Sequence, residues 1–169
     1  LVRSRGLGDV YKRQALHTAS QRENKPLVRS THFLLPPGDN DPIEHNILSW
    51  KAQEFAYRQF SQDREALPTL ARGLFTEKVH GQYERIVIRG YDKFFNQDEL
   101  AWTLPNAIAT YSTGPFILSF KENGCIIFIS AITPKRLIVT SKHSLGFRTE
   151  GDKPTHAEMG WHWVRHHLA

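Results

Sequence analysis

The chain has 169 residues, 40% of them apolar, and a formal charge of +5 at pH 7. This size suits one hydrophobic core, because single domains commonly hold about 100 to 200 residues. No apolar run approaches the roughly 18 residues of a membrane span, and no apolar secretory leader is visible, so neither is expected. The single cysteine, Cys125, excludes a disulfide within the chain and favours an intracellular location, cytoplasmic or nuclear.

The positive charge is concentrated near the N-terminus. Residues 1–30 contain seven Lys and Arg against two acidic residues, which accounts for the whole excess of +5. From residue 31 onward, basic and acidic residues are equal in number, at fifteen each. Nucleic-acid binding by this larger part would therefore depend on local basic clusters and not on net charge.

The first 40 residues are not expected to form part of the main fold. Residues 1–14 lack a clear periodicity and are interpreted as a non-native leader, such as a translated cloning scar; a native basic arm that contacts RNA phosphates is the alternative. Residues 15–40 are polar and interrupted by three prolines and Gly38, which predicts an irregular lead-in.

Helices are predicted at three later places in the chain. Asp41 before Pro42 indicates a helix start, with an apolar face that continues to Phe60. A helical turn is expected from Asn96 and an interruption at Pro105, and a last helix is expected near Thr155, whose capping box is completed by Glu158.

Short β-type runs rich in Val, Ile and Phe occupy the rest of the chain. They are Gly73–Glu77, Glu84–Arg89, Phe116–Lys121, Gly124–Ile132 and Arg136–Lys142. Cys125 alternates with Ile127 and Ile129 in the fourth run, which predicts a buried thiol. The predicted fold class is α+β, a mostly antiparallel sheet with helices at its periphery.

Lys121 is the strongest candidate for chemistry in this chain. It stands between two apolar β-type runs, beside an Asn123-Gly124 turn. A hairpin here would hold the amine partly away from water, where a lysine can act as a nucleophile. The alternative is that Lys121 is an ordinary lysine at a hairpin tip and that Gly124 only forms the turn.

Four basic residues lie at strand ends or bends and are expected to converge on one pocket: Arg72, Lys93, Lys121 and Lys142. Each has an aromatic, glycine or small residue beside it. Cations together with aromatic rings suit a nucleotide, because the rings stack on a base and the cations neutralise phosphates.

Four segments carry a resemblance to a known family: Leu67–Phe75, Arg89–Asn96, Lys121–Gly124 and Val139–Ser144. In this order and spacing they resemble the adenylyltransferase domain of fungal-type tRNA ligases and, more distantly, phage RNA ligase 1. The resemblance covers roughly residues 40–168. It implies a covalent nucleotidyltransferase-like fold, with residues 41–169 as the N-terminal part of the RNA ligase domain.

The resemblance also implies roles for individual residues. Lys121 would be the catalytic nucleophile, while Arg72 and Lys93 would contact ATP phosphates and Lys142 would complete the phosphate clamp. The remaining nucleotide-binding candidates are Phe95, which would pack near the adenine or ribose, Gly124, which would let the backbone approach the nucleotide, and Glu122. The alternatives are core packing for Phe95, a surface ion pair for Arg72, and solvated side chains for Lys142 and Glu122.

The implied activity is ATP-dependent RNA ligation in tRNA splicing. Lysine attacks ATP to form lysyl-AMP, AMP passes to an RNA 5′-phosphate, and a 3′-hydroxyl end is then joined. ATP and Mg²⁺ are the implied cofactors, and tRNA half-molecules the implied partners. No match to the family's later acidic and Lys-x-Lys motifs is found in residues 143–169. The domain is therefore expected to be incomplete at its C-terminus, and this chain alone is not expected to ligate.

Two other functions would use residues of this chain. A non-catalytic RNA-binding or scaffold module would use the same basic and aromatic residues without chemistry. A metal site is suggested by His156, His162 and His166, since the last two are four residues apart on a predicted helix. No matching acidic motif accompanies them, so no metal site is predicted.

Overall fold

The computed structural model describes the chain apart from residues 1–6, 64–65, 80–82, 147–152 and 169. Its main sheet has four antiparallel strands in the order β1 (Val28–Leu35), β2 (His45–Ala52), β3 (Leu74–Val79) and β4 (Tyr83–Arg89). A second, two-stranded sheet pairs β5 (Phe128–Thr133) with β6 (Arg136–Thr140). Together with the helices, these antiparallel sheets confirm the predicted α+β class.

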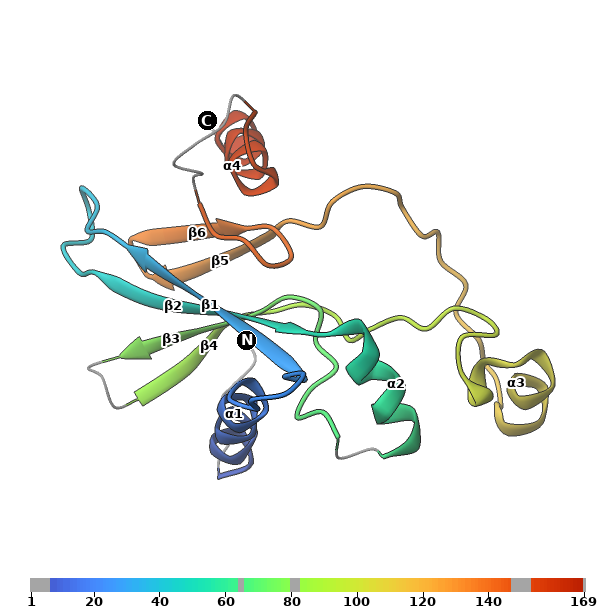
Figure 1. The fold of residues 1–169 in the computed structure, drawn as a ribbon. Helices are drawn as coiled ribbons and strands as arrows, with labels where there is room; N and C mark the ends of the chain where they lie inside the picture. The colour runs from blue at the N-terminus through green and yellow to red at the C-terminus, as the bar shows by residue number, and fades with distance from the viewer. Residues whose placement is uncertain (1–6, 64–65, 80–82, 147–152, 169) are drawn as a thin grey trace.

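The helices lie at the periphery of the sheets (Figure 1). They are α1 (Leu7–Ser20), α2 (Glu54–Gln62), the 3₁₀ helix η1 (Ala101–Thr103), α3 (Pro105–Tyr111) and α4 (His156–Leu168). Within the described part of the chain, no helix combines the length and the apolar character that crossing a membrane requires.

The four-stranded sheet separates two hydrophobic clusters. One contains Leu16 of α1 and Trp50 of β2, and the other contains Ile47 of β2 and Ile132 of β5. Since alternate residues of a strand face opposite sides of a sheet, Ile47 and Trp50 belong to different faces. Figure 1 shows this division, with α1 on one side of the sheet and the β5–β6 hairpin on the other.

The prediction of a helix from Asp41 onward is wrong for its first part, because residues 45–52 form the strand β2. Its residues are buried in near alternation, as a strand requires, and β2 pairs with β1 on one side and β3 on the other. Pairing along both edges therefore overrides the local signal of Asp41 and Pro42 for a helix start. Only the later part of the predicted helix is helical, as α2.

The predicted irregular lead-in also holds regular structure. Residues 15–40 contain the end of α1 and all of β1. Leu16 is buried, and the ring of His17 meets that of Trp50 edge to face at 4.8 Å. Within residues 1–14, interpreted above as a leader, 7–14 belong to α1, and 1–6 lie outside the described residues.

Several other predictions are confirmed. The runs at Gly73, Glu84 and Arg136 correspond to β3, β4 and β6. The capping box at the start of α4 is present, because the Thr155 backbone N–H donates to the Glu158 carboxylate and the Glu158 N–H donates to the Thr155 hydroxyl, at 2.5 and 3.2 Å. The prediction of a helical turn from Asn96 is wrong, because residues 96–100 are not helical and the 3₁₀ helix η1 begins only at Ala101. Pro105 begins α3 at its first turn and does not interrupt a helix.

The segment before β5 differs most from prediction. Residues 116–127 are irregular, so the hairpin predicted around Lys121 is absent, and β5 begins only at Phe128. Ile117, Leu118 and Phe120 are each more than 90% exposed. A strand needs backbone partners, and no described residue pairs with this segment. Cys125, predicted to be buried, is exposed for the same reason.

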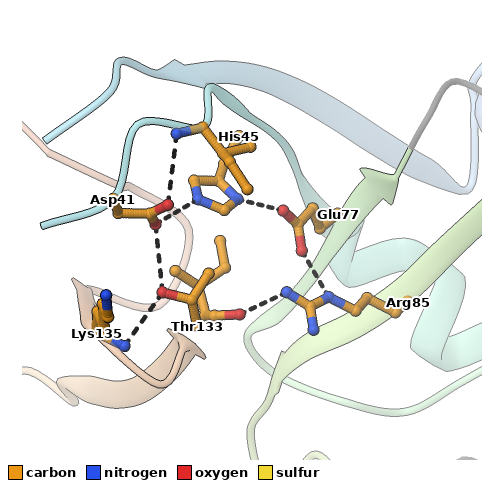
Figure 2. A network of polar contacts seen from close by, with 8 residues as sticks. Asp41, His45, Glu77, Arg85, Thr133 and Lys135 are labelled. Atoms are coloured by element: carbon orange, nitrogen blue, oxygen red, sulfur yellow. Dashed lines mark hydrogen bonds and ion pairs between the residues drawn. The ribbon is translucent and has the colours of Figure 1, made fainter.

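A buried polar network fastens the β5–β6 hairpin to the main sheet (Figure 2). His45 donates to Asp41 Oδ2 at 2.8 Å and hydrogen-bonds to Glu77 through its other ring nitrogen. Glu77 accepts a hydrogen bond from Arg85 Nε at 2.6 Å, and Arg85 also donates to the Ile132 carbonyl oxygen of β5 at 2.5 Å. This network holds the hairpin, whose second strand leads directly to Lys142.

Candidate functional site

The site is built on a continuation of the β3–β4 ladder beyond the ends of its strands. The Arg72 N–H donates to the Tyr91 carbonyl at 2.8 Å, and the Lys93 N–H donates to the Leu70 carbonyl at 2.9 Å. Ala71 and Asp92 form an isolated antiparallel bridge between the two segments. Two cationic residues from distant sequence positions are thereby held on neighbouring backbone segments.

Two glycines permit close packing at this point. A Cβ on Gly73 would lie 2.4 Å from the Phe128 ring, and one on Gly90 would lie 2.7 Å from the same ring. Gly73 also has φ +93°, which disfavours any residue with a side chain. The Phe128 ring of β5 therefore lies directly over the ladder, bringing the hairpin against the segments that carry Arg72 and Lys93.

The turn after β6 contributes the third cation. The Ser141 N–H donates to the Ser144 carbonyl at 2.9 Å, and the Ser144 N–H donates to the Ser141 hydroxyl at 3.2 Å. The Ser49 hydroxyl of β2 donates to the His143 carbonyl at 2.9 Å. These bonds fix Lys142 and His143 in a tight turn that is tied to the main sheet.

These elements surround a cavity of about 520 Å³, within the range of about 300 to 1,000 Å³ typical of small-molecule sites. Its lining comes from five parts of the chain: Arg72; Tyr91, Asp92 and Phe94; Gly124, Cys125 and Ile126; Ser141, Lys142, His143 and Ser144; and His156 at the start of α4. Three predicted site residues, Arg72, Gly124 and Lys142, thus meet at one cavity.

Lys93 lies beside the cavity, among aromatic rings. Its ammonium is 4.6 Å from the centre of the Phe95 ring and 5.7 Å from that of Tyr57, while the Arg72 guanidinium is 5.9 Å from the Tyr57 ring. Tyr57 of α2 therefore lies near two of the predicted cations, and burial raises the pKa of its hydroxyl. Lys93 and Arg72 each pair with a carboxylate, Glu99 at 2.6 Å and Glu54 at 2.9 Å.

The electrostatics of the turn are those of a crowded positive site. Burial lowers the pKa of the Lys142 amine, and the nearby charges of Arg72, Lys51 and Lys93 lower it further. Burial also lowers the pKa of His143 to about 4, reinforced by Lys142, Lys51 and Arg72. Since an added negative charge would relieve this crowding, the site is suited to an anionic ligand.

The other predicted site residues are placed differently. Lys121 and Glu122 are exposed in the irregular segment and do not line the cavity, although Gly124, three residues after Lys121, does. Phe95 packs edge to face against Trp102, with ring centres 5.9 Å apart, and lies under Lys93, outside the cavity lining.

Sequence reasoning missed four residues of the site. The rings of Tyr91 and Phe94, 6.1 Å apart and largely exposed, line the cavity in place of Phe95. Both lie within the segment Arg89–Asn96, which carries the family resemblance. The sequence did not indicate that these two rings are exposed and available to a ligand. His143 adjoins Lys142, whereas Tyr57 carried no signal because it reaches the site only through the packing of α2.

No group of three or more metal-ligating side chains suited to a metal ion occurs among the described residues. His162 and His166 of α4 are both exposed, while His156 lies at the cavity. The three histidines considered above are thus not assembled into one centre.

A protein-family model described as "RNA ligase" matches residues 70–169 of this chain. This match includes β3, β4, the β5–β6 hairpin, α4 and all twelve residues that line the cavity. The chain belongs to the RNA ligase family.

Two fungal proteins are similar to this chain over most of its length. Relative to tRNA ligase 1 of Schizosaccharomyces pombe, the chain is 44% identical over 158 residues, which cover 86% of the chain. Relative to the tRNA ligase of Candida albicans, it is 45% identical over 137 residues, which cover 79% of the chain. The matches span only 19% and 15% of those relatives, respectively.

Proposed function

We propose that this chain is the nucleotide-binding part of an ATP-dependent tRNA ligase in which Lys121 becomes lysyl-AMP. The observation that carries the proposal is the cavity where Arg72, Lys142 and Gly124 converge, with Lys93 beside it, in a chain of the RNA ligase family. The partners proposed are tRNA half-molecules, as the names of both fungal relatives suggest.

The cations suit the phosphates of ATP. Arg72 presents a planar fork of donors, and Lys142 adds a compact charge to the same cavity lining. Preorganised positive groups of this kind stabilise the charge that develops during phosphoryl transfer. The exposed rings of Tyr91 and Phe94 supply apolar faces on which a base can stack.

The proposed chemistry begins at the Lys121 amine, which must be unprotonated to attack. Its nitrogen forms a bond with the α-phosphorus, the bond from that phosphorus to the bridging oxygen of pyrophosphate breaks, and the nitrogen releases a proton. The AMP group then passes to an RNA 5′-phosphate, which frees the amine. Attack by an RNA 3′-hydroxyl on that activated phosphate releases AMP and joins the RNA ends.

The ligand proposed for this cavity is a magnesium–nucleotide complex. Mg²⁺ on a nucleotide is held mainly by phosphate oxygens and waters, so few protein ligands are needed. Asp92 is the carboxylate in the lining, although it also pairs with Arg89 at 2.5 Å. When bound, the ion would neutralise phosphate charge and help orient the triphosphate.

Lys121 must approach the cavity for this chemistry to occur. It is exposed on a segment without regular structure, whereas Gly124 reaches the cavity lining. The exposure of Lys121 is also the observation that favours the second candidate, an RNA-binding or scaffold module without chemistry. In that module the same cavity would hold an RNA phosphate or nucleotide.

The test is protein labelling with ATP that carries a radioactive α-phosphate. This chain and a full-length relative are incubated with labelled ATP and Mg²⁺, and the products are separated on a denaturing gel. Label that stays on the protein and is lost in Lys121→Ala supports the ligase, with Lys135→Ala as a matched control on another exposed lysine. Label on the relative but not on this chain would assign the failure to missing sequence.

The module predicts another result. RNA binding that persists in Lys121→Ala, with no label on this chain or on the full-length relative, would contradict the ligase proposal. RNA binding is measured with a single strand that ends in a 5′-phosphate, beside the same strand with a 5′-hydroxyl. Preference for the phosphate end would place the cation cluster at the RNA terminus.

A further inference from the structure

One polar atom beside the cavity has no hydrogen-bond partner. His143 lines the cavity, and its Nδ1 atom is buried without a partner among the described residues. The backbone of His143 cannot easily move, since its carbonyl accepts a hydrogen bond from Ser49 and its turn is closed by two further bonds. The backbone at His143 is therefore fixed, and one nitrogen of its ring is enclosed by protein.

This enclosure determines where the imidazole carries its proton. A buried N–H without an acceptor is rarer and more costly than a buried lone pair without a donor. The neutral ring therefore keeps its proton on Nε2 and leaves Nδ1 as the unpaired acceptor. Because Nδ1 is covered, a ligand in the cavity can form a polar contact with this ring only through Nε2.

The surroundings also keep the ring uncharged. A second proton would have to be placed on the enclosed Nδ1, next to Lys142 and near Lys51 and Arg72. No carboxylate is hydrogen-bonded to His143 among the described residues, whereas Arg72 and Lys93 each have one. His143 is thus a neutral Nε2–H donor inside a positive site.

We propose that His143 donates this hydrogen bond to the uncharged part of the nucleotide, an oxygen of the ribose or an acceptor atom of the base. The proposal rests on the nucleotide site proposed above, but it is independent of any transfer of AMP to Lys121.

Phosphate and nucleoside are expected to bind to different donors of this site. Phosphate oxygens bind most strongly to charged donors, and Arg72 and Lys142 already present such donors in the lining. Beside these two charged donors, a neutral imidazole would add little to the binding of a phosphate. A ribose or base acceptor carries no charge, so a neutral donor suits it and gives discrimination between a nucleotide and a bare polyphosphate.

The experiment compares two ligands that differ only in the nucleoside. Affinities for ATP and for inorganic tripolyphosphate, both with Mg²⁺, are measured by calorimetry in the Lys121→Ala background, which prevents covalent turnover. His143→Leu is expected to weaken ATP binding roughly 2- to 10-fold, the effect of one neutral hydrogen bond, and to leave tripolyphosphate binding unchanged. His143→Gln, whose amide nitrogen replaces Nε2, should retain most of the ATP affinity.

Two controls separate this effect from general damage. Lys142→Ala should weaken both ligands, because it removes a phosphate contact, and His162→Leu, on the exposed part of α4, should weaken neither. Should His143→Leu fold poorly, NMR of the unsubstituted chain takes its place. ATP should shift the Nε2 resonance of His143, which reports the Nε2–H form, and tripolyphosphate should leave it nearly unchanged.

Each alternative result has a distinct meaning. His143→Leu could weaken the binding of ATP and of tripolyphosphate equally, or could leave both affinities unchanged. Either result would overturn the role of His143 while leaving the nucleotide site intact. Absence of ATP binding by the unsubstituted chain would overturn both proposals. A selective loss of ATP affinity without any label on Lys121 would uphold His143 and contradict the proposed covalent chemistry.

Discussion

The ammonium of Lys93 donates a hydrogen bond of 2.6 Å to Glu99, six residues further along the chain. Glu99 also accepts the backbone N–H of Asn96 at 2.8 Å, so one carboxylate ties the buried lysine to the start of the next turn. Lys93 is only 8% exposed, and its charge needs such a partner. Glu99 therefore positions one of the cations beside the cavity.

Replacing Glu99 with glutamine is expected to lower the melting temperature at pH 7, because the Lys93 ammonium loses its charged partner. The hydrogen bond from Lys93 holds the pKa of Glu99 below its ordinary value of 4.5. A carboxylate with a lowered pKa stabilises the fold above about pH 4.5, and this contribution is lost as the pH falls through the lower value. The difference between the two proteins should therefore shrink in acid.

Thermal unfolding followed by circular dichroism at pH 7 and at pH 3.5 measures this difference. Glu122→Gln is the control, since Glu122 is exposed and forms no hydrogen bond with the described residues that would be lost. A melting temperature of Glu99→Gln equal to that of the unsubstituted chain at pH 7 would show that the ion pair does not hold Lys93.

A second prediction concerns His143 and the stability of the fold in acid. Its pKa is about 4 in the folded chain, against an ordinary value of 6.5. Between these values the unfolded chain binds a proton that the folded chain does not, so the free energy of unfolding should fall as the pH is lowered from 6.5 to 4. His143→Gln cannot bind that proton and should show a smaller fall over this range. Urea unfolding at several pH values, with His162→Gln as the control, tests it.

The elements that sequence reasoning located correctly have strong local signals. In β3 and β4, β-branched and aromatic residues lie between glycines, and at the start of α4 the Thr155–Glu158 pair caps the helix without help from elsewhere. The β2 strand was missed because its structure depends on two partner strands far along the chain. Local capping signals cannot report such pairing.

The site residues also divide into those with a local sequence signal and those that depend on contacts far along the chain. Arg72 and Lys142 were assigned to one site from their positions at strand ends, and both line the cavity. Lys121 was expected on a hairpin because apolar β-type runs flank it, yet such runs form strands only where other strands accept their hydrogen bonds. Tyr57 could not be predicted, since packing of α2 alone brings its ring near two cations.

Alanine at Gly73 is expected to destabilise the fold by roughly 1 to 3 kcal/mol, through backbone strain and overpacking together. Its Cβ would lie 2.4 Å from the Phe128 ring, and φ is +93°. Gly124→Ala is the matched control, because φ there is +137° but no atom of the described residues lies within 4 Å of the added carbon. The double variant Gly73→Ala with Phe128→Leu should recover part of the loss if the clash contributes, and chemical unfolding measures all four proteins.

Loss of His45 is expected to loosen the β5–β6 hairpin. Its two ring nitrogens hydrogen-bond to the carboxylates of Asp41 and Glu77, and all three side chains are buried. The hydrogen bond from His45 also lowers the pKa of Asp41 below its ordinary 3.8. His45→Leu would leave two buried carboxylates whose charged partner among the described residues is Arg85 alone, so the melting temperature at neutral pH should fall by more than in Glu99→Gln.

The hairpin itself should report the change. The Thr133 hydroxyl lies 3.3 Å from Asp41, and Arg85 holds the Ile132 carbonyl, so disorder in the network is transmitted to β5 (Figure 2). Hydrogen exchange of β5 and β6 amides should accelerate in His45→Leu while that of α1 is unchanged. His32→Leu is the matched control, because His32 also bonds a side chain, Asn46 at 2.6 Å, but is exposed. Acceleration of equal size in both variants would mean that the buried network does not secure the hairpin.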